Sequence, residues 1–121
     1  MADPPLILVV DDEQSYRDAL AVALQREGFL VETAADGPEA IARFDSARPA
    51  LVLLDVMLPK ISGIDVCREL RARSRVPIIM VTTETDPEKL DAVRRLGVLV
   101  CDKSFRPDEV RSILDKLLKS P

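Results

Sequence analysis

Five polar residues whose chemistry suits phosphoryl transfer stand at the ends of four apolar segments in this chain of 121 residues. In chain order they are Asp11 and Asp12 after the first segment, Asp55 after the second, Thr82 after the third, and Lys103 just beyond the fourth. If the segments are parallel strands of one sheet, their carboxyl ends lie along the same edge. Three carboxylates, a hydroxyl and an ammonium group there would suit phosphoryl transfer with a divalent metal.

The apolar segments alternate with longer amphipathic stretches, which predicts five strand–helix units and an α/β domain. We predict strands over residues 6–10, 30–33, 50–54, 78–81 and 98–101. We predict helices over about 14–27, 62 or 63 to 72, and 85–96, with two more that open at 36–38 and 106–107. Thr85 is the expected cap of the fourth helix because Glu88 follows three residues later, as in a capping box.

The order of the strands follows from how parallel strands connect. Right-handed crossovers leave few arrangements, and the commonest open one for five strands is 2-1-3-4-5, which binds ligands between strands one and three. Strands one, three and four are almost wholly apolar, as strands covered on both faces should be. We therefore predict a doubly wound, flavodoxin-like parallel sheet with helices on both faces, formed by residues 1–121 as a single domain.

Composition narrows the range of functions. A net charge of −4 argues against direct nucleic-acid binding by this chain. The sequence has no apolar run long enough to span a membrane and its first residues lack a basic leader, so we expect a cytoplasmic protein. Histidine is absent, and Cys67 and Cys101 lack the spacing of metal ligands, which disfavours zinc and histidine-dependent nucleophilic catalysis.

The predicted cluster of three carboxylates requires positive charge, because unpaired carboxylates repel one another. Lys103 supplies one charge, and Mg²⁺, which prefers carboxylate, water and phosphate oxygens, supplies the remaining two. Asp55 would then be the nucleophile, and a separate molecule would be the phosphoryl donor. Taken singly, each residue has an ordinary explanation as a helix cap, strand former or solvated charge. Their convergence at one edge favours a functional site.

Four sequence signatures, taken together, resemble the receiver domain of two-component response regulators of the chemotaxis-regulator type. They are ILVVDDE at residues 7–13, LLDVMLP at residues 53–59 with Gly63 after it, PIIMVT at residues 77–82, and Lys103 with Phe105. The resemblance covers the whole chain. It implies a signalling switch in a phosphorelay that catalyses only its own phosphorylation and dephosphorylation.

The resemblance also implies roles for individual residues. Asp55 would accept the phosphoryl group from the phosphohistidine of a histidine kinase or phosphotransfer protein. Mg²⁺ would be held by Asp12, Asp55 and the backbone carbonyl of Met57, with Asp11 acting largely through water.

Thr82 and Lys103 would contact the phosphoryl group. The face formed by helix 4, strand 5 and helix 5 would carry the signal to an output domain or protein. Dimerisation through the last two helices is compatible with the sequence, although no large apolar surface there supports it.

Two positions depart from the family pattern. Val100 stands where strand five usually carries an aromatic residue that moves with the threonine, so we expect weakened or rerouted signal transmission. Ser104 replaces the usual proline after Lys103, and we predict a trans peptide bond there because a non-proline cis bond costs about 2.5–4 kcal/mol.

Two alternative functions stay open at this point. A pseudo-receiver would keep the fold as an interaction module without switching, which the departures at Val100 and Ser104 favour and the intact acidic set opposes. A phosphohydrolase with an aspartyl-phosphate intermediate would need an aspartate two residues after Asp55, where Met57 stands.

Overall fold

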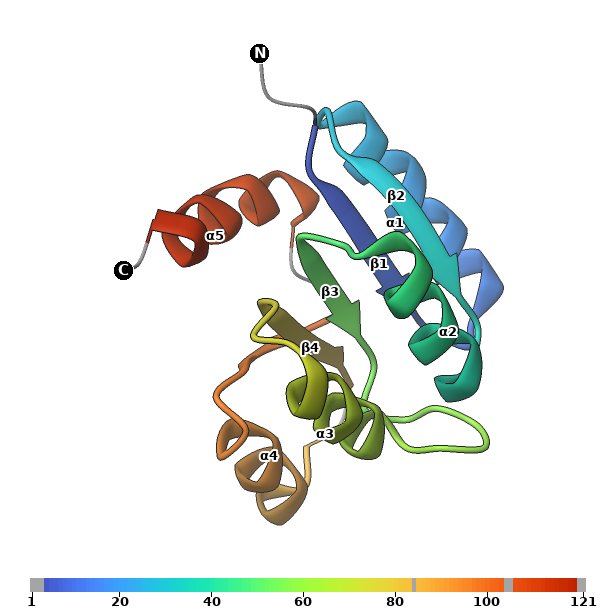
Figure 1. Cartoon of the computed structure of the whole chain (residues 1–121), viewed down its shortest axis with the longest axis vertical. Coiled ribbons are helices and arrows are strands. Elements are labelled where there is room, and N and C mark those ends of the chain that lie inside the picture. The colour runs from blue at the N-terminus through green and yellow to red at the C-terminus, as the bar shows by residue number, and fades with distance from the viewer. Residues whose placement is uncertain (1–3, 84, 104–105, 120–121) are drawn as a thin grey trace.

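Five parallel strands form one sheet in the predicted order β2–β1–β3–β4–β5 (Figure 1). The structure is a computed structural model that describes residues 4–83, 85–103 and 106–119. The strands are β1 (Leu6–Val10), β2 (Leu30–Ala34), β3 (Leu51–Leu54), β4 (Ile78–Thr82) and β5 (Leu99–Asp102). The helices are α1 (Gln14–Arg26), α2 (Gly37–Ala47), α3 (Gly63–Arg73), α4 (Pro87–Arg94) and α5 (Pro107–Lys119).

The sheet is covered by helices on both faces, as the apolar strands predict. Successive residues of a strand point to opposite faces, so each central strand contributes to two hydrophobic cores. One core joins alternate residues of β1, β3 and β4 to α2, α3 and α4 through side chains such as Phe44, Leu70 and Val93. The other joins the remaining residues to α1 and α5 through Leu20, Leu24 and Val110. This double cover fixes the strands, and with them the loops at their carboxyl ends.

Helix caps define where three of the helices begin. Asp36 caps α2 by accepting a hydrogen bond from the backbone N–H of Glu39 at 2.9 Å, and Ser62 caps α3 in the same way. The prediction that Thr85 caps α4 is wrong. Asp86 is the cap and its carboxylate accepts from the backbone N–H of Glu88 at 3.0 Å, because Pro87 then occupies the first helical position, where its missing N–H costs nothing.

The region from α4 to β5 also differs in its boundaries. Helix α4 ends at Arg94, two residues before the predicted end, and Gly97 turns the chain with a positive φ of 74°. Strand β5 then begins at Leu99 rather than at residue 98. As the edge strand it is less buried than its neighbours, and Leu99 is 45% exposed.

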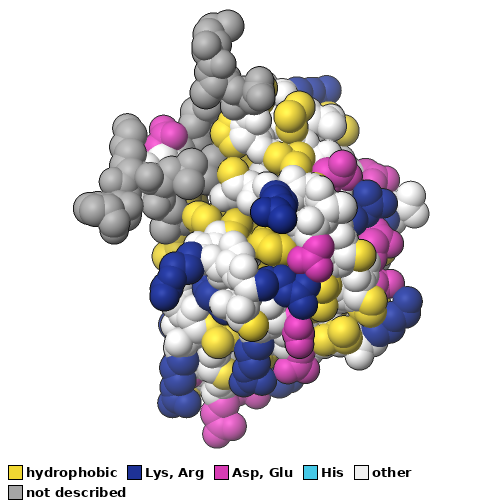
Figure 2. Space-filling model, viewed as in Figure 1, with side chains coloured by type: hydrophobic (Ala, Val, Ile, Leu, Met, Phe, Trp, Pro, Cys, Tyr) yellow, Lys and Arg dark blue, Asp and Glu magenta, His cyan; other side chains and the backbone are white. Residues whose placement is uncertain are grey.

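The surface carries both signs of charge. Figure 2 shows acidic and basic side chains interspersed with hydrophobic ones over the face it presents. Among the described residues, we find no helix that is both long and apolar enough to cross a lipid bilayer.

Candidate functional site: an acidic cluster at the carboxyl edge of the sheet

The predicted site residues lie at the carboxyl edge of the sheet, where strands β1, β3, β4 and β5 end. Asp11 and Asp12 follow β1, Asp55 follows β3, Thr82 is the last residue of β4, and Lys103 follows β5. Backbone hydrogen bonds extend the strand pairing to the site itself. The N–H of Asp55 donates to the carbonyl of Val10 at 3.0 Å. Parallel pairing of β1 and β3 therefore brings the two acidic loops together.

Three carboxylates meet at this edge. One oxygen from each of Asp11, Asp12 and Asp55 lies within 4.8 Å of the others. Asp11 and Asp55 are only 2% and 5% exposed, whereas Asp12 lies at the surface. Two of the charges are therefore shielded from water, and the third borders the solvent from which a ligand would enter.

Lys103 connects the two buried carboxylates. Its Nζ lies 2.8 Å from Oδ2 of Asp11 and 3.1 Å from Oδ2 of Asp55. Burial alone lowers the pKa of Lys103, but its hydrogen bonds to Asp11 and Asp55 outweigh that effect and raise the pKa overall. Lys103 is therefore fully charged at neutral pH.

Backbone amides fix the remaining oxygens of the buried carboxylates. Oδ1 of Asp11 accepts from the N–H of Glu13 at 2.9 Å, and Oδ1 of Asp55 accepts from the N–H of Met57 at 3.1 Å. Burial raises the pKa of Asp55, and the bonds from Met57 and Lys103 only partly oppose this effect. The fold thus holds Asp55 in a position where its negative charge is disfavoured.

Gly63 allows the loop after β3 to pass close to the site. Its N–H donates to the carbonyl of Val56 at 2.8 Å. A Cβ atom at this position would lie 1.9 Å from the carbonyl oxygen of Asp55, a distance that only glycine permits. This residue therefore helps to set the backbone that carries the candidate nucleophile.

Thr82 and Met57, the other predicted site residues, lie at the same edge. Thr82 is 3% exposed at the end of β4, and its Cα pairs with that of Asp102 on β5. Met57 brings its backbone to Asp55, while its side chain is 58% exposed. Val100, at the position of the expected aromatic residue, is half-buried against the core. The Lys103–Ser104 peptide bond lies outside the described residues.

Sequence reasoning missed two residues that surround the site. Arg17 donates to the backbone carbonyl of Asp11 at 2.7 Å. Tyr16 lies beneath Lys103, with Nζ 4.8 Å from the centre of its ring. The helical period offered a signal, since Tyr16 precedes Leu20 by one turn and so lies on the inward face of α1. The pattern could not show that this face reaches Lys103.

A cavity of about 570 Å³ opens beside the acidic cluster. Its wall includes Asp12, the exposed Met57 and Lys89 of α4. This hollow provides space next to the carboxylates for a molecule from solution.

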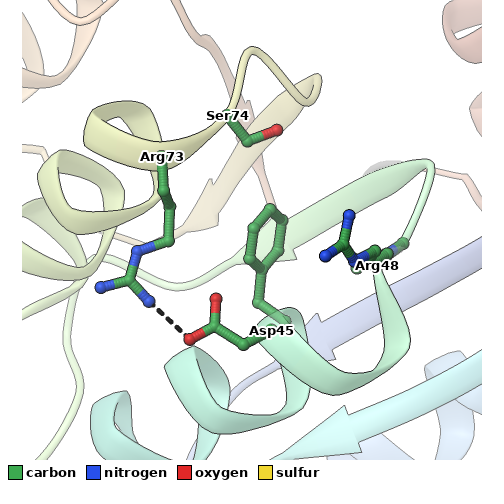
Figure 3. Close-up of a pocket in the computed structure, with 6 residues that line it drawn as sticks. Asp45, Arg48, Arg73 and Ser74 are labelled. Atoms are coloured by element: carbon green, nitrogen blue, oxygen red, sulfur yellow. Dashed lines mark hydrogen bonds and ion pairs between the residues drawn. The ribbon is translucent and has the colours of Figure 1, made fainter.

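A second cavity, of about 470 Å³, lies at the opposite, amino edge of the sheet. It is lined by Phe44, Asp45, Arg48, Pro49, Arg73 and Ser74, which come from the ends of α2 and α3 and the segments that follow them. Figure 3 shows the Arg73 side chain reaching from α3 to Asp45 of α2, with Arg48 on the other side of the cavity. None of the predicted site residues lines it.

The donor set at the carboxyl edge fits a hard divalent cation. Three carboxylates against one ammonium group leave an excess of two negative charges, and oxygen ligands are those that Mg²⁺ prefers. Fold and site together define an α/β domain of receiver type, with an acidic cluster at the point where the strand order reverses.

Comparisons with known proteins agree with this class. The family model described as the response regulator receiver domain matches residues 7–115. The chain belongs to this family and is a receiver domain of the two-component response regulators.

Among curated relatives, the sensory transduction protein RegX3 of Mycobacterium tuberculosis is 44% identical over 92% of this chain and 48% of its own length. The DNA-binding response regulator MtrA of Mycolicibacterium smegmatis is 47% identical over 86% of this chain and 46% of its own length. The chain therefore spans about half the length of these relatives.

Solved structures show the same fold. A CheY-like receiver domain protein from Methanospirillum hungatei JF-1 has a TM-score of 0.88 and 27% identity, covering 96% of this chain and 98% of that one. The response regulator TrrA of Thermotoga maritima, in complex with Mg(2+)-BeF, has a TM-score of 0.82 and 37% identity, covering 93% and 98%.

Proposed function

We propose that this chain is a phosphorylation switch in which Asp55 accepts a phosphoryl group from the phosphohistidine of a histidine kinase or phosphotransfer protein. The observation that carries the proposal is the contact of Lys103 with both buried carboxylates, at 2.8 Å from Asp11 and 3.1 Å from Asp55. This contact places one positive charge beside Asp55, the candidate nucleophile. The absence of histidine from the chain is consistent with a donor on another molecule.

Asp11, Asp12 and Asp55 would hold Mg²⁺, together with the backbone at Met57. When bound, Mg²⁺ would neutralise the excess negative charge and polarise the oxygens of the incoming phosphoryl group. The complex of the related TrrA with Mg(2+)-BeF supports this assignment.

In the transfer step a carboxylate oxygen of Asp55 forms a bond to phosphorus while the P–N bond of the donor phosphohistidine breaks. The electron pair of that bond returns to the imidazole, which takes up a proton. The Lys103 ammonium and the Thr82 hydroxyl bind the phosphoryl oxygens, whose negative charge persists in the product. Hydrolysis of the acyl phosphate by water returns Asp55 to the carboxylate.

The output of the switch would pass through α4, β5 and α5. This face includes the edge strand with the exposed Leu99. Its partner would be an output domain or protein, and the name of the relative MtrA suggests DNA binding as one type of output. We place residues 1–121 in a single receiver domain that acts in the cytoplasm.

A pseudo-receiver is the second candidate, and one observation favours it. Val100 leaves β5 without the aromatic side chain that the family uses to transmit phosphorylation. Under this alternative the chain would keep the fold and bind partners without responding to phosphate.

The test is phosphorylation by acetyl phosphate in Mg²⁺, followed by intact-protein mass spectrometry. We expect the wild type to gain one phosphoryl group and Asp55→Asn to gain none. Asp45→Asn, at the amino edge, is the matched control and should behave as wild type. Omission of Mg²⁺ should abolish the reaction in the wild type and in Asp45→Asn.

A wild-type chain that gains no phosphoryl group under these conditions would overturn the switch and favour the pseudo-receiver. Equal phosphorylation of Asp55→Asn would show that another residue is the acceptor.

A further inference from the structure

Tyr16 contacts Lys103 at two separate points. The Lys103 ammonium lies 4.8 Å from the centre of the Tyr16 ring, and the Tyr16 hydroxyl donates to the backbone carbonyl of Lys103 at 3.4 Å. The two residues are 87 positions apart in the sequence. A single side chain of α1 therefore holds both the charged end and the backbone of the lysine that follows β5.

The location of Tyr16 makes this contact relevant to the site. Tyr16 belongs to the first turn of α1, directly after the loop that carries Asp11 and Asp12. Its ring packs against the core formed with α1 and α5, and this packing holds the ring in place. Tyr16 therefore connects the acidic loop to the residue that neutralises it.

We infer that Tyr16 is a positioning residue for phosphoryl transfer, which acts by holding the Lys103 ammonium over the acidic cluster. Lysine is a flexible side chain, and holding it in one orientation costs conformational entropy. An aromatic face attracts the ammonium group without competing for its hydrogen-bond donors. Those donors remain directed to Asp11 and Asp55, and to the phosphoryl oxygens when these arrive.

The two contacts make different contributions. The hydroxyl bond is long at 3.4 Å and tethers the backbone of Lys103 weakly. The ring acts on the ammonium group directly and allows it to slide from one oxygen to another. The ring should therefore account for most of the effect, with a smaller part from the hydroxyl.

This inference rests on the proposed phosphorylation of Asp55, and the experiment separates the two. Initial rates of phosphorylation by acetyl phosphate in Mg²⁺ are measured for the wild type, Tyr16→Phe and Tyr16→Leu, with Val22→Ala on the exposed face of α1 as control. We expect Tyr16→Leu to lower the saturating rate about tenfold, Tyr16→Phe to lower it no more than about threefold, and Val22→Ala to leave it unchanged. The half-saturating donor concentration should change less than the rate.

A double-mutant cycle with Lys103→Met tests whether Tyr16 acts through the lysine. In the Lys103→Met background, Tyr16→Leu should change the residual rate less than about twofold, because nothing is left for the ring to hold. A purely structural role would instead give the same loss in both backgrounds. Urea unfolding of each variant establishes that it is folded at the assay temperature.

The single tyrosine gives an independent readout. The chain has one Tyr and no Trp, so its tyrosine fluorescence reports Tyr16 alone. Addition of beryllofluoride and Mg²⁺ should change this emission in the wild type and leave it unchanged in Lys103→Met.

Three results would overturn the inference while leaving Asp55 as acceptor: a wild-type rate for Tyr16→Leu, equal losses for the Phe and Leu variants, or undiminished loss in the Lys103→Met background. A wild type that is never phosphorylated would overturn the proposed function instead.

Discussion

Two ion-pair clusters of nearly identical layout lie at opposite edges of the sheet. At the carboxyl edge, Lys103 contacts Asp11 at 2.8 Å and Asp55 at 3.1 Å. At the amino edge, Arg73 contacts Asp45 at 2.7 Å and Glu69 at 3.3 Å. Each cluster therefore places one cation between two carboxylates.

The clusters differ in burial. The side chains of Lys103 and Asp11 are 17% and 3% exposed, whereas those of Arg73 and Asp45 are 37% and 55% exposed (Figure 3). Water screens the amino-edge charges, so that pair contributes little to stability. At the carboxyl edge the charges interact strongly and remain unbalanced, because Asp12 adds a third carboxylate. Contact distance alone would not distinguish the two clusters.

The two edges should differ most, in phosphorylation rate and in stability, when the cation of each cluster is replaced. We expect Lys103→Met to lower the rate of phosphorylation about 100-fold, because a positioned cation at the phosphoryl oxygens is lost. In EDTA the same change should lower the free energy of unfolding by about 3 kcal/mol, since two buried carboxylates lose their partner. Arg73→Met should leave the rate unchanged and cost less than about 1 kcal/mol.

Acetyl phosphate labelling and urea denaturation measure the two quantities. Equal losses of stability in the two variants would contradict the assigned difference between the edges.

Most of the fold and the site could be predicted from sequence because their signals are local and strong. The apolar segments of β1, β3 and β4 identify a doubly covered sheet, and the polar residue that ends each one identifies the edge. Once strands one and three are adjacent, Asp11 and Asp55 must meet. Chain connectivity supplies the adjacency without any knowledge of side-chain contacts.

Two features could not be predicted, for physical reasons. Thr85 and Asp86 are both good helix caps, and the choice depends on which side chain reaches a free backbone N–H once Pro87 is fixed. The contact of Tyr16 with Lys103 depends on the relative placement of α1 and the end of β5, far apart in the sequence. Periodicity indicates which face of α1 is buried and says nothing of the residue it meets.

The two edges should differ less in stability when one carboxylate is neutralised at each edge. Burial raises the pKa of Asp55, so folding disfavours its charged form. In EDTA at neutral pH, Asp55→Asn should therefore increase the free energy of unfolding. Asp45→Asn should change it by less than about 0.5 kcal/mol.

The sign of this effect on stability can be checked by varying the pH. A carboxyl whose pKa is raised in the folded state destabilises the fold fully above its folded pKa, and this penalty shrinks to nothing as pH falls from the folded pKa to the lower, unfolded pKa. The advantage of Asp55→Asn should shrink over that range in urea denaturation. An advantage that grows on acidification would contradict the raised pKa.

The smallest expected effect is on the pKa of Tyr16, which depends on burial and on the charged groups of the carboxyl edge. Burial raises the pKa of Tyr16 to about 12; Lys103 lowers it, and Asp11 and Asp55 raise it. Tyrosinate absorbance after a rapid pH jump should therefore give a midpoint near pH 12. Asp55→Asn should lower that midpoint and Lys103→Met should raise it, while Asp45→Asn leaves it in place because its charge lies at the other edge.

The same shift makes the folded protein more sensitive to alkali. Because the folded state binds the phenolic proton more tightly, the contribution of Tyr16 to stability is complete below the unfolded pKa of about 10. It is lost as pH rises from there toward the folded value of about 12. Tyr16→Phe cannot ionise, so its stability should fall less steeply over this interval. Parallel stability curves for the two proteins, or a wild-type midpoint near pH 10, would mean that burial does not raise the pKa of Tyr16 in the folded protein.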